Sequence, residues 1–170
     1  MNVIELLLFL LPVYIANASP VMLGGGAPLD FGKNLSDGRR IFGDGKTVRG
    51  FAGGVLSGIV AGGIITFLFP LSFFSSVQAQ FLAATFMSFG TLVGDAAGSF
   101  IKRRMNVDSG KPFFLDIILF LVVALLFSLP VTSSTAYTAD KLAFYFALTI
   151  ILHPLTNLLA NRAGLKKVPW

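Results

Sequence analysis

The stretch FAGGVLSGIVAGGIITFLFPLS (residues 51–72) carries no charged side chain anywhere along its length. A helix needs about 20 apolar residues to cross the hydrocarbon core of a bilayer. Four other stretches approach this length, at residues 3–23, 79–101, 113–131 and 141–160. The sequence therefore predicts an all-α integral membrane protein with five transmembrane helices.

The composition of the 170-residue chain supports this class. Hydrophobic residues make up 55% and charged residues only 12%, whereas soluble domains carry about 25% charged residues. This length predicts one domain, residues 1–170. The chain has no cysteine and a single histidine, His153, which excludes disulfides, thiolate metal sites and histidine-rich metal sites.

The basic residues predict how the chain is oriented. Every lysine and arginine except Lys141 lies in the Gly-rich segment 24–50, in segment 102–112 or in the tail from residue 162 onward. Five spans place all three segments on one side, and the positive-inside rule makes that side cytoplasmic. We therefore expect a multi-pass protein of the cell membrane with its N-terminus outside and its C-terminus in the cytoplasm. The long Gly-rich loop between helices 1 and 2 and the active site then face the cytoplasm.

Small and polar residues at helical spacing predict contacts between spans. Glycine recurs every fourth residue at positions 50, 54, 58 and 62, and again at 90, 94 and 98. Such stripes let helix backbones approach closely, which favours tight packing between the second and third spans. His153 and Asn157 share one face of the fifth span, which favours hydrogen bonds across helices over a substrate contact.

Two aspartates are the strongest candidates for chemistry. Asp95 lies inside the third span, where a carboxylate is costly and a functional site is the default hypothesis. The alternative is a structural ion pair with a lysine or arginine. Asp116 opens the fourth span, where the helix dipole alone also favours a carboxylate. The short hairpin between these spans brings the two aspartates close together, and such a pair suits Mg²⁺, which binds one or two carboxylates plus substrate phosphates.

Charges of both signs fill the hairpin between these aspartates. It contains Lys102, Arg103, Arg104, Asp108 and Lys111. A topology signal would explain the basic residues alone. A phosphate site with its metal explains both signs, because lysine and arginine hold phosphate oxygens while carboxylates hold the metal.

The Gly-rich segment 24–50 is the second charged stretch. GDGKT (residues 43–47) is similar to the end of a P-loop, but Arg40 stands where that motif needs an earlier glycine, and no strand precedes it. What remains is a flexible basic loop whose backbone N–H groups can turn toward a polyphosphate. The alternative is an ordinary cytoplasmic loop, although its length favours a function.

The motifs together resemble a known enzyme superfamily. The run SFIKR (residues 99–103), followed by Asp108 and by FLD (residues 114–116), resembles the signature of the phosphatidate cytidylyltransferases. GDGKTVRG (43–50), GDAAGSFIKRR (94–104) and LKKVPW (165–170) are similar to the short archaeal branch of that superfamily, the CDP-archaeol synthases, which are CTP:2,3-di-O-geranylgeranylglyceryl phosphate cytidylyltransferases. The likeness covers nearly the whole chain.

The resemblance implies a membrane enzyme that transfers CMP from CTP to an isoprenoid ether lipid phosphate and releases pyrophosphate. It implies Mg²⁺, with Asp95 and Asp116 in the acidic positions. The expected partners are CTP, the lipid phosphate and the bilayer, without nucleic acid, and a homo-oligomer stays open. With the residues above, the expected catalytic residues are Asp95, Lys102 and Asp116. The expected substrate-binding residues are Asn34, Gly45, Lys46, Thr47, Arg49, Arg103, Asp108 and Lys111.

One position departs from the superfamily pattern, and two other functions stay open. Leu119 stands where a second aspartate is usual, so the metal site would rely more on Asp108, on water or on the substrates. A CDP-alcohol phosphotransferase is one alternative, but the segment Asp37 to Arg40 matches only the start of that motif. A phospholipid transporter or flippase would use the same basic residues without turnover.

Overall fold

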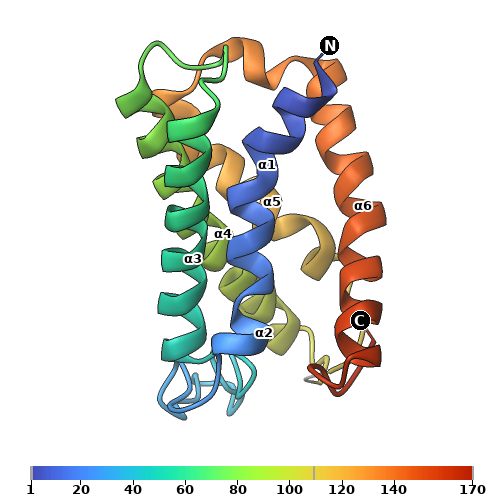
Figure 1. Ribbon diagram of the computed structural model, residues 1–170. Coiled ribbons are helices and arrows are strands. Elements are labelled where there is room, and N and C mark those ends of the chain that lie inside the picture. The colour runs from blue at the N-terminus through green and yellow to red at the C-terminus, as the bar shows by residue number, and fades with distance from the viewer. Residues whose placement is uncertain (1, 109, 170) are drawn as a thin grey trace.

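The computed structural model describes residues 2–108 and 110–169, and these residues form a helical bundle without a β-strand (Figure 1). The α-helices, in chain order, are α1 (Val3–Ala18), α2 (Pro20–Leu23), α3 (Val48–Leu68), α4 (Val77–Arg104), α5 (Leu115–Ser128) and α6 (Ala139–Arg162). Two short 3₁₀ helices, η1 (Leu129–Val131) and η2 (Ser134–Tyr137), connect α5 to α6. The all-helical class expected from the sequence is therefore confirmed.

Side-chain caps fix where two of the long helices begin. Thr47 Oγ1 accepts a hydrogen bond from the Gly50 N–H at 3.0 Å at the start of α3. Ser76 Oγ accepts one from the Ala79 N–H at 3.1 Å at the start of α4. Each cap satisfies a backbone donor that has no partner within the first helical turn. The cap on α3 matters for the site, because it anchors the end of the Gly-rich segment to a helix.

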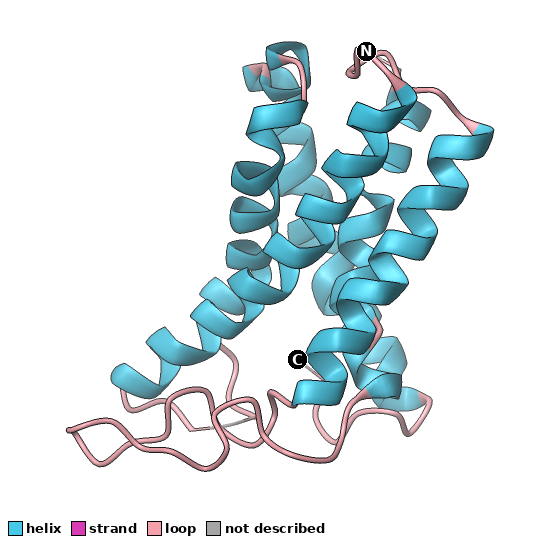
Figure 2. Cartoon of the chain, turned by 90° about the vertical axis from the view of Figure 1, so that its left-hand side faces the viewer, coloured by secondary structure: helices cyan, strands magenta, loops and turns pink. Residues whose placement is uncertain are grey.

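Within the described residues, four helical segments are long and apolar enough to cross a membrane: Val3–Leu23, Val48–Leu68, Val77–Arg104 and Ala139–Arg162. The remaining predicted span forms a shorter apolar segment, Leu115–Val131. Its α-helical part, α5, has 14 residues and rises about 21 Å, less than the ~30 Å hydrocarbon core. It packs against α4 and α6 within the bundle. Most of the irregular chain, including the Gly-rich segment, gathers at one end of the bundle (Figure 2).

The glycine stripes bring helix backbones into contact, as the sequence predicts. A Cβ atom added at Gly58 would lie 2.3 Å from Ser88 Oγ on α4 and 2.9 Å from Ala16 Cβ on α1. The stripe on α3 therefore packs against both neighbours. The stripe on α4 behaves differently, because a Cβ at Gly94 would lie 2.7 Å from the Leu119 carbonyl oxygen on α5. Assigning that second stripe to the α3–α4 contact was wrong, since its glycines and Ser88 lie on different faces of α4.

Helix α6 closes the bundle at one end only. Its buried residues are Tyr145 and Thr149, both in its first half. Tyr145 packs against Phe9 of α1, with ring centroids 5.6 Å apart, and Tyr14 OH lies 2.8 Å from Thr149 Oγ1. The second half of α6 contributes no buried residue and instead borders a cavity at the charged end of the bundle.

Candidate active site

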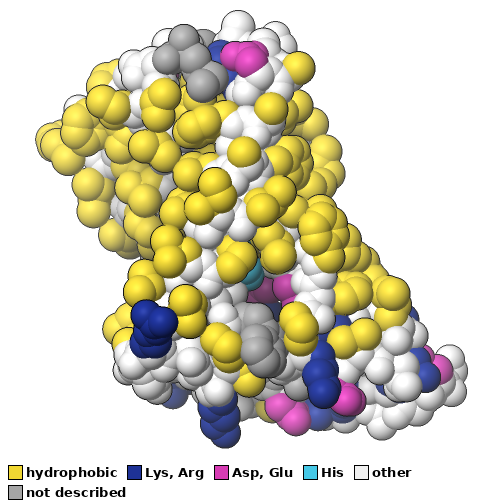
Figure 3. All heavy atoms as spheres, turned by 90° about the vertical axis from the view of Figure 1, so that its right-hand side faces the viewer, with side chains coloured by type: hydrophobic (Ala, Val, Ile, Leu, Met, Phe, Trp, Pro, Cys, Tyr) yellow, Lys and Arg dark blue, Asp and Glu magenta, His cyan; other side chains and the backbone are white. Residues whose placement is uncertain are grey.

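A cavity of about 380 Å³ lies at the end of the bundle where the basic segments gather. We call it the charged cavity. Its polar lining comes from the end of α1, the Gly-rich segment, α4, the hairpin after α4, the start of α5, the second half of α6 and the tail. Figure 3 shows a hollow among apolar side chains near this end, with histidine and acidic side chains visible inside. Polar and charged side chains thus lie next to an apolar surface.

Two ion pairs lie in the charged cavity. Lys46 Nζ, from the Gly-rich segment, donates to Asp95 Oδ2 on α4 at 2.6 Å. Lys102 Nζ, from the end of α4, donates to Asp116 Oδ2 on α5 at 2.7 Å. Lys102 is buried, with 7% of its surface exposed, and it also donates to the Lys111 carbonyl oxygen. Asp95 therefore forms an ion pair with a lysine, as the structural alternative to a functional site predicts. Both ion pairs nevertheless line a cavity that is large enough to hold phosphate groups.

A second cavity of about 560 Å³ adjoins the first. We call it the loop cavity, because glycines of the Gly-rich segment form one wall, and Phe51 of α3 and Leu92 of α4 are among its apolar lining residues. Gly45, Lys46 and Asp95 line both cavities. The Lys46–Asp95 ion pair therefore stands at the boundary between a charged space and a more apolar one.

Most of the site residues expected from the sequence come together here. Seven of them line the charged cavity: Gly45, Lys46, Asp95, Lys102, Arg103, Lys111 and Asp116. Thr47 lines the loop cavity while its hydroxyl caps α3. The spacing between α4 and α5 thus brings Asp95 and Asp116 to one cavity, as the hairpin argument requires.

Three expected residues lie elsewhere. Asn34 is exposed and pairs with Arg40 in an isolated bridge within the Gly-rich segment. Arg49 is exposed on the first turn of α3, whereas the next residue, Gly50, is buried. Asp108 is exposed and lines a separate cavity of about 220 Å³. Among the described residues, neither cavity at the ion pairs includes these three in its lining.

Leu119 itself has a packing role. A Cβ atom added at Gly98 would lie 3.8 Å from Leu119 Cδ2 and 3.6 Å from Asp116 Oδ1. Leu119 therefore fills space on the glycine face of α4 beside the carboxylate that the site retains.

The tail supplies residues that the sequence argument did not place in the site. Lys166 and Lys167 line the charged cavity, and Lys166 Nζ donates to Asn157 Oδ1 on α6 at 2.9 Å. Burial lowers the pKa of Lys166, and the nearby Lys46 ammonium lowers it further. The available signal was the LKKVPW motif, whose last residue, Trp170, lies outside the described residues. From the sequence alone, the positive charge of these lysines predicts only which side of the membrane the tail occupies.

Polar residues of α1 and α6 form the far wall of the cavity. Asn17 Nδ2 lies 3.5 Å from His153 Nδ1, which agrees with the predicted hydrogen bond across helices. The His153 ring also stacks on Phe120 of α5, with centroids 5.5 Å apart. Asn157 bonds to the tail lysine rather than to another helix. His153 and Asn157 also line the charged cavity.

Comparison with known proteins identifies the family. Residues 1–170 match the family described as CarS-like, CDP-archaeol synthase. The chain is 47% identical over 170 residues to the CDP-archaeol synthase of Pyrococcus horikoshii, covering 99% of this chain and 98% of that protein. It is 42% identical over 175 residues to the CDP-archaeol synthase of Archaeoglobus fulgidus, again covering 99% and 98%.

A solved structure shares the fold as well as the sequence. It is described as an intramembrane enzyme for archaeal membrane lipids biosynthesis, and it is 34% identical to this chain. The TM-score is 0.79, and the match covers 92% of this chain and 95% of the solved one. With the full-length family match and the curated relatives, this similarity shows that the chain belongs to the CDP-archaeol synthase family.

Proposed function

We propose that this chain forms CDP-archaeol in the charged cavity, by transferring CMP from CTP to 2,3-di-O-geranylgeranylglyceryl phosphate with release of pyrophosphate. This is a step of archaeal membrane phospholipid synthesis. One observation carries the proposal beyond family membership. Two carboxylates and at least four cationic side chains line a single cavity at the charged end of an apolar bundle. That arrangement suits a reaction between two phosphate-bearing substrates, one of which has long apolar chains.

The orientation of the bundle is part of the proposal. We assign five passes, with α5 and η1 as the fourth, the N-terminus outside, and the charged end in the cytoplasm of a cell-membrane protein. The basic segments share that end, while Lys141 lies at the start of α6 at the other. The positive-inside rule then favours a cytoplasmic charged cavity, where CTP is available.

The residues present fit Mg²⁺, with Asp95 and Asp116 as its protein ligands. Among the described residues no group of three or more histidine, cysteine or acidic side chains could hold a metal ion. Mg²⁺ commonly uses only one or two carboxylates and takes its other ligands from water and substrate phosphates. When bound, it would neutralise charge on the phosphate oxygens that react.

The protein's own residues position the substrates. An oxygen of the lipid phosphate attacks the α-phosphorus of CTP, the new P–O bond forms, and the bond to the bridging oxygen breaks as pyrophosphate leaves with its electron pair. No protein nucleophile is required, because the attacking phosphate is already anionic. Lys46, Lys102, Arg103 and Lys111 hold the phosphate oxygens in line, and this positioning is the main contribution expected of a phosphoryl-transfer site.

The direct test uses purified protein reconstituted in lipid with CTP, Mg²⁺ and the ether lipid phosphate. We expect pyrophosphate and CDP-archaeol in equal amounts. A panel of other nucleoside triphosphates and an ester-linked lipid phosphate measures the selectivity for each substrate. Release of CMP from a CDP-lipid would instead indicate a phosphotransferase. Movement of the lipid phosphate across the bilayer without consumption of CTP would indicate a transporter.

The carboxylate roles have a matched control at the opposite end of the bundle. Asp95→Asn and Asp116→Asn should each reduce turnover at least about 100-fold, because several kcal/mol of transition-state charge stabilisation are lost. Asp140→Asn makes the same change at an exposed position at the start of α6, outside the charged cavity, and should alter turnover by less than about threefold. Near-normal turnover in Asp95→Asn would contradict the metal role.

A further inference from the structure

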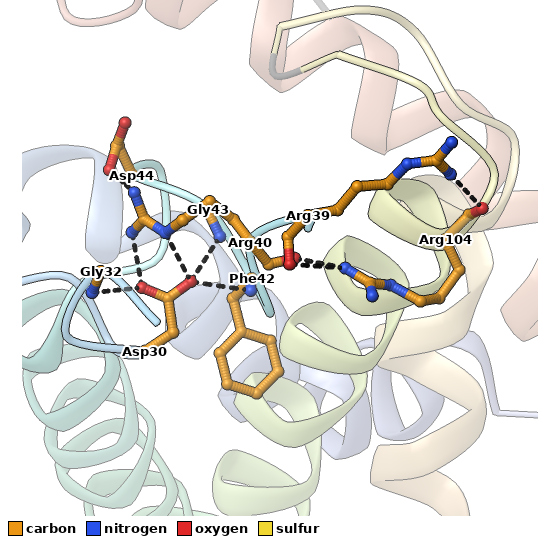
Figure 4. A network of polar contacts seen from close by, with 8 residues as sticks. All are labelled: Asp30, Gly32, Arg39, Arg40, Phe42, Gly43, Asp44 and Arg104. Carbon is orange, nitrogen blue, oxygen red and sulfur yellow. Dashed lines mark hydrogen bonds and ion pairs between the residues drawn. The ribbon is translucent and has the colours of Figure 1, made fainter. Parts of the chain in front are cut away.

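Asp30 is a buried carboxylate in the middle of the Gly-rich segment. Its side chain is fully enclosed, with 0% of its surface exposed. It accepts hydrogen bonds from the backbone N–H groups of Gly32 at 3.1 Å, and of Phe42 and Gly43, both at 2.9 Å. Arg40 adds bonds from Nε at 3.2 Å and from Nη2 (Figure 4). Burial alone would raise the pKa of Asp30, but these donors outweigh it and hold the pKa of the carboxyl below its usual range.

The donors around Asp30 belong to the two arms of one loop. Gly32 lies two residues after Asp30, whereas Phe42 and Gly43 begin the stretch that leads to Lys46. Gly43 has a positive φ of 90°, a conformation that a side chain rarely adopts. Asp30 therefore fixes the turn from which the GDGKT stretch starts.

The neighbouring backbone extends this control to Lys46. The Leu29 N–H donates to the Lys46 carbonyl oxygen at 2.7 Å, and the Lys46 N–H donates to the Gly43 carbonyl oxygen at 3.3 Å. Leu29 directly precedes Asp30 in the chain, and the Gly43 N–H donates to the Asp30 carboxylate. The backbone of Lys46 is thus bonded on one side to the residue before Asp30 and on the other to a residue that the Asp30 carboxylate holds.

The same loop is docked onto α4, the helix that carries Asp95. Arg39 Nη1 donates to the Arg104 carbonyl oxygen at 2.8 Å, where α4 ends. Arg104 Nη2 donates back to the carbonyl oxygens of Arg39 at 3.2 Å and of Arg40 at 2.6 Å (Figure 4). Arg40, the residue that clamps Asp30, is therefore tied to α4 through its own backbone.

From these contacts we propose that Asp30 is a positioning residue of the reaction, because its buried clamp with Arg40 sets where the Lys46 ammonium stands relative to Asp95. Asp30 touches neither cavity and acts through Lys46. The inference deepens the proposed function and rests on it. Lys46 should then hold the triphosphate well only when the clamp is intact, because displacing a phosphate-binding group by about 1 Å can cost up to about 100-fold in rate.

The test compares Asp30→Asn with Asp37→Asn in the reconstituted protein. Both variants make the same change in the same loop, but Asp37 is 39% exposed and pairs with Arg104 at the surface. We expect Asp30→Asn to raise the KM for CTP about 10- to 100-fold, with a smaller change in kcat. Asp37→Asn should shift KM less than about threefold. Equal effects in the two variants would overturn the inference.

A second measurement separates positioning from a general loss of structure. If Asp30 acts through Lys46, adding Lys46→Met to Asp30→Asn should cost much less than Lys46→Met costs the wild-type protein. Full additivity of the two effects would overturn the inference. If Asp30→Asn does not fold, Arg40→Lys takes its place, because lysine keeps the charge but cannot make the forked contacts to Asp30. A wild-type protein that consumes no CTP would instead contradict the proposed function.

Discussion

Each carboxylate of the charged cavity pairs with a lysine ammonium, at the place where we propose that Mg²⁺ binds. Lys46 neutralises Asp95, and Lys102 neutralises Asp116. A metal ion bound at the aspartates would release both ammonium groups toward the substrate phosphates. Metal and nucleotide should therefore strengthen each other's binding, because each compensates the charge that the other exposes.

Lys46→Met tests this exchange. Removal of the ammonium frees the Asp95 carboxylate, so Mn²⁺ without nucleotide should bind about tenfold more tightly, whereas CTP should bind about tenfold more weakly. Electron paramagnetic resonance of free Mn²⁺ and equilibrium dialysis of CTP measure the two affinities. Lys33→Met, an exposed position in the same loop, should change neither. Weaker Mn²⁺ binding by Lys46→Met would show that the lysine does not compete with the metal.

The lowered pKa of Asp30 predicts that the stability of the folded protein depends on pH. Its folded-state pKa lies below the ordinary carboxyl value of about 3.9. The ionised form therefore stabilises the folded loop fully above that pH, and this contribution is lost as pH falls from about 4 toward the lower folded-state pKa. Circular dichroism melting curves should show the wild-type midpoint falling over this range. The melting midpoint of Asp30→Asn should fall less steeply, and parallel curves for the two proteins would contradict the assignment.

The cavity residues that could be predicted are those whose charge is conspicuous in an apolar chain. Asp95 stood out because a carboxylate inside a span is costly, and Asp116 because a short hairpin had to bring it near. Asp30 gave no such signal, since its donors depend on how a glycine-rich loop turns. The signal for Lys166 was the LKKVPW motif, which does not show that the folded tail brings this lysine beside Asn157.

At the scale of helices, one face of α3 sets the spacing of the bundle. A Cβ atom added at Gly62 would lie 2.3 Å from Ala84 Cβ, whereas one added at the adjacent Gly63 would lie 3.4 Å from Phe81. Gly62→Ala must therefore separate α3 from α4 and should cost about 1–3 kcal/mol. Gly63→Ala should be neutral or slightly stabilising, because alanine favours helix. Thermal melting in detergent compares them, and equal midpoints would contradict the close contact.

Helix existence was predictable from hydropathy, whereas helix faces and lengths were not. Each predicted span contains a helix, because a long apolar run in a bilayer must satisfy its backbone hydrogen bonds internally and a helix does so within one segment. The stripe at Gly94 was assigned to the wrong neighbour, because periodicity shows that a face is small but not which helix covers it. Helix α5 is shorter than the predicted span 113–131, because it begins at Leu115 and because Leu129–Val131 form a 3₁₀ turn instead of continuing it.

For the whole molecule, a cysteine-free sequence makes the proposed orientation directly testable. Lys33→Cys places one thiol in the Gly-rich segment at the charged end, and Ser75→Cys places one in the connection between α3 and α4 at the other end. Both positions are exposed. With the charged cavity in the cytoplasm, a membrane-impermeant maleimide added to intact cells should label only Ser75→Cys. Lys33→Cys should react only after the membrane is opened. The reverse pattern would place the cavity outside, where no intracellular CTP could reach it, and would contradict the orientation together with the proposed source of nucleotide.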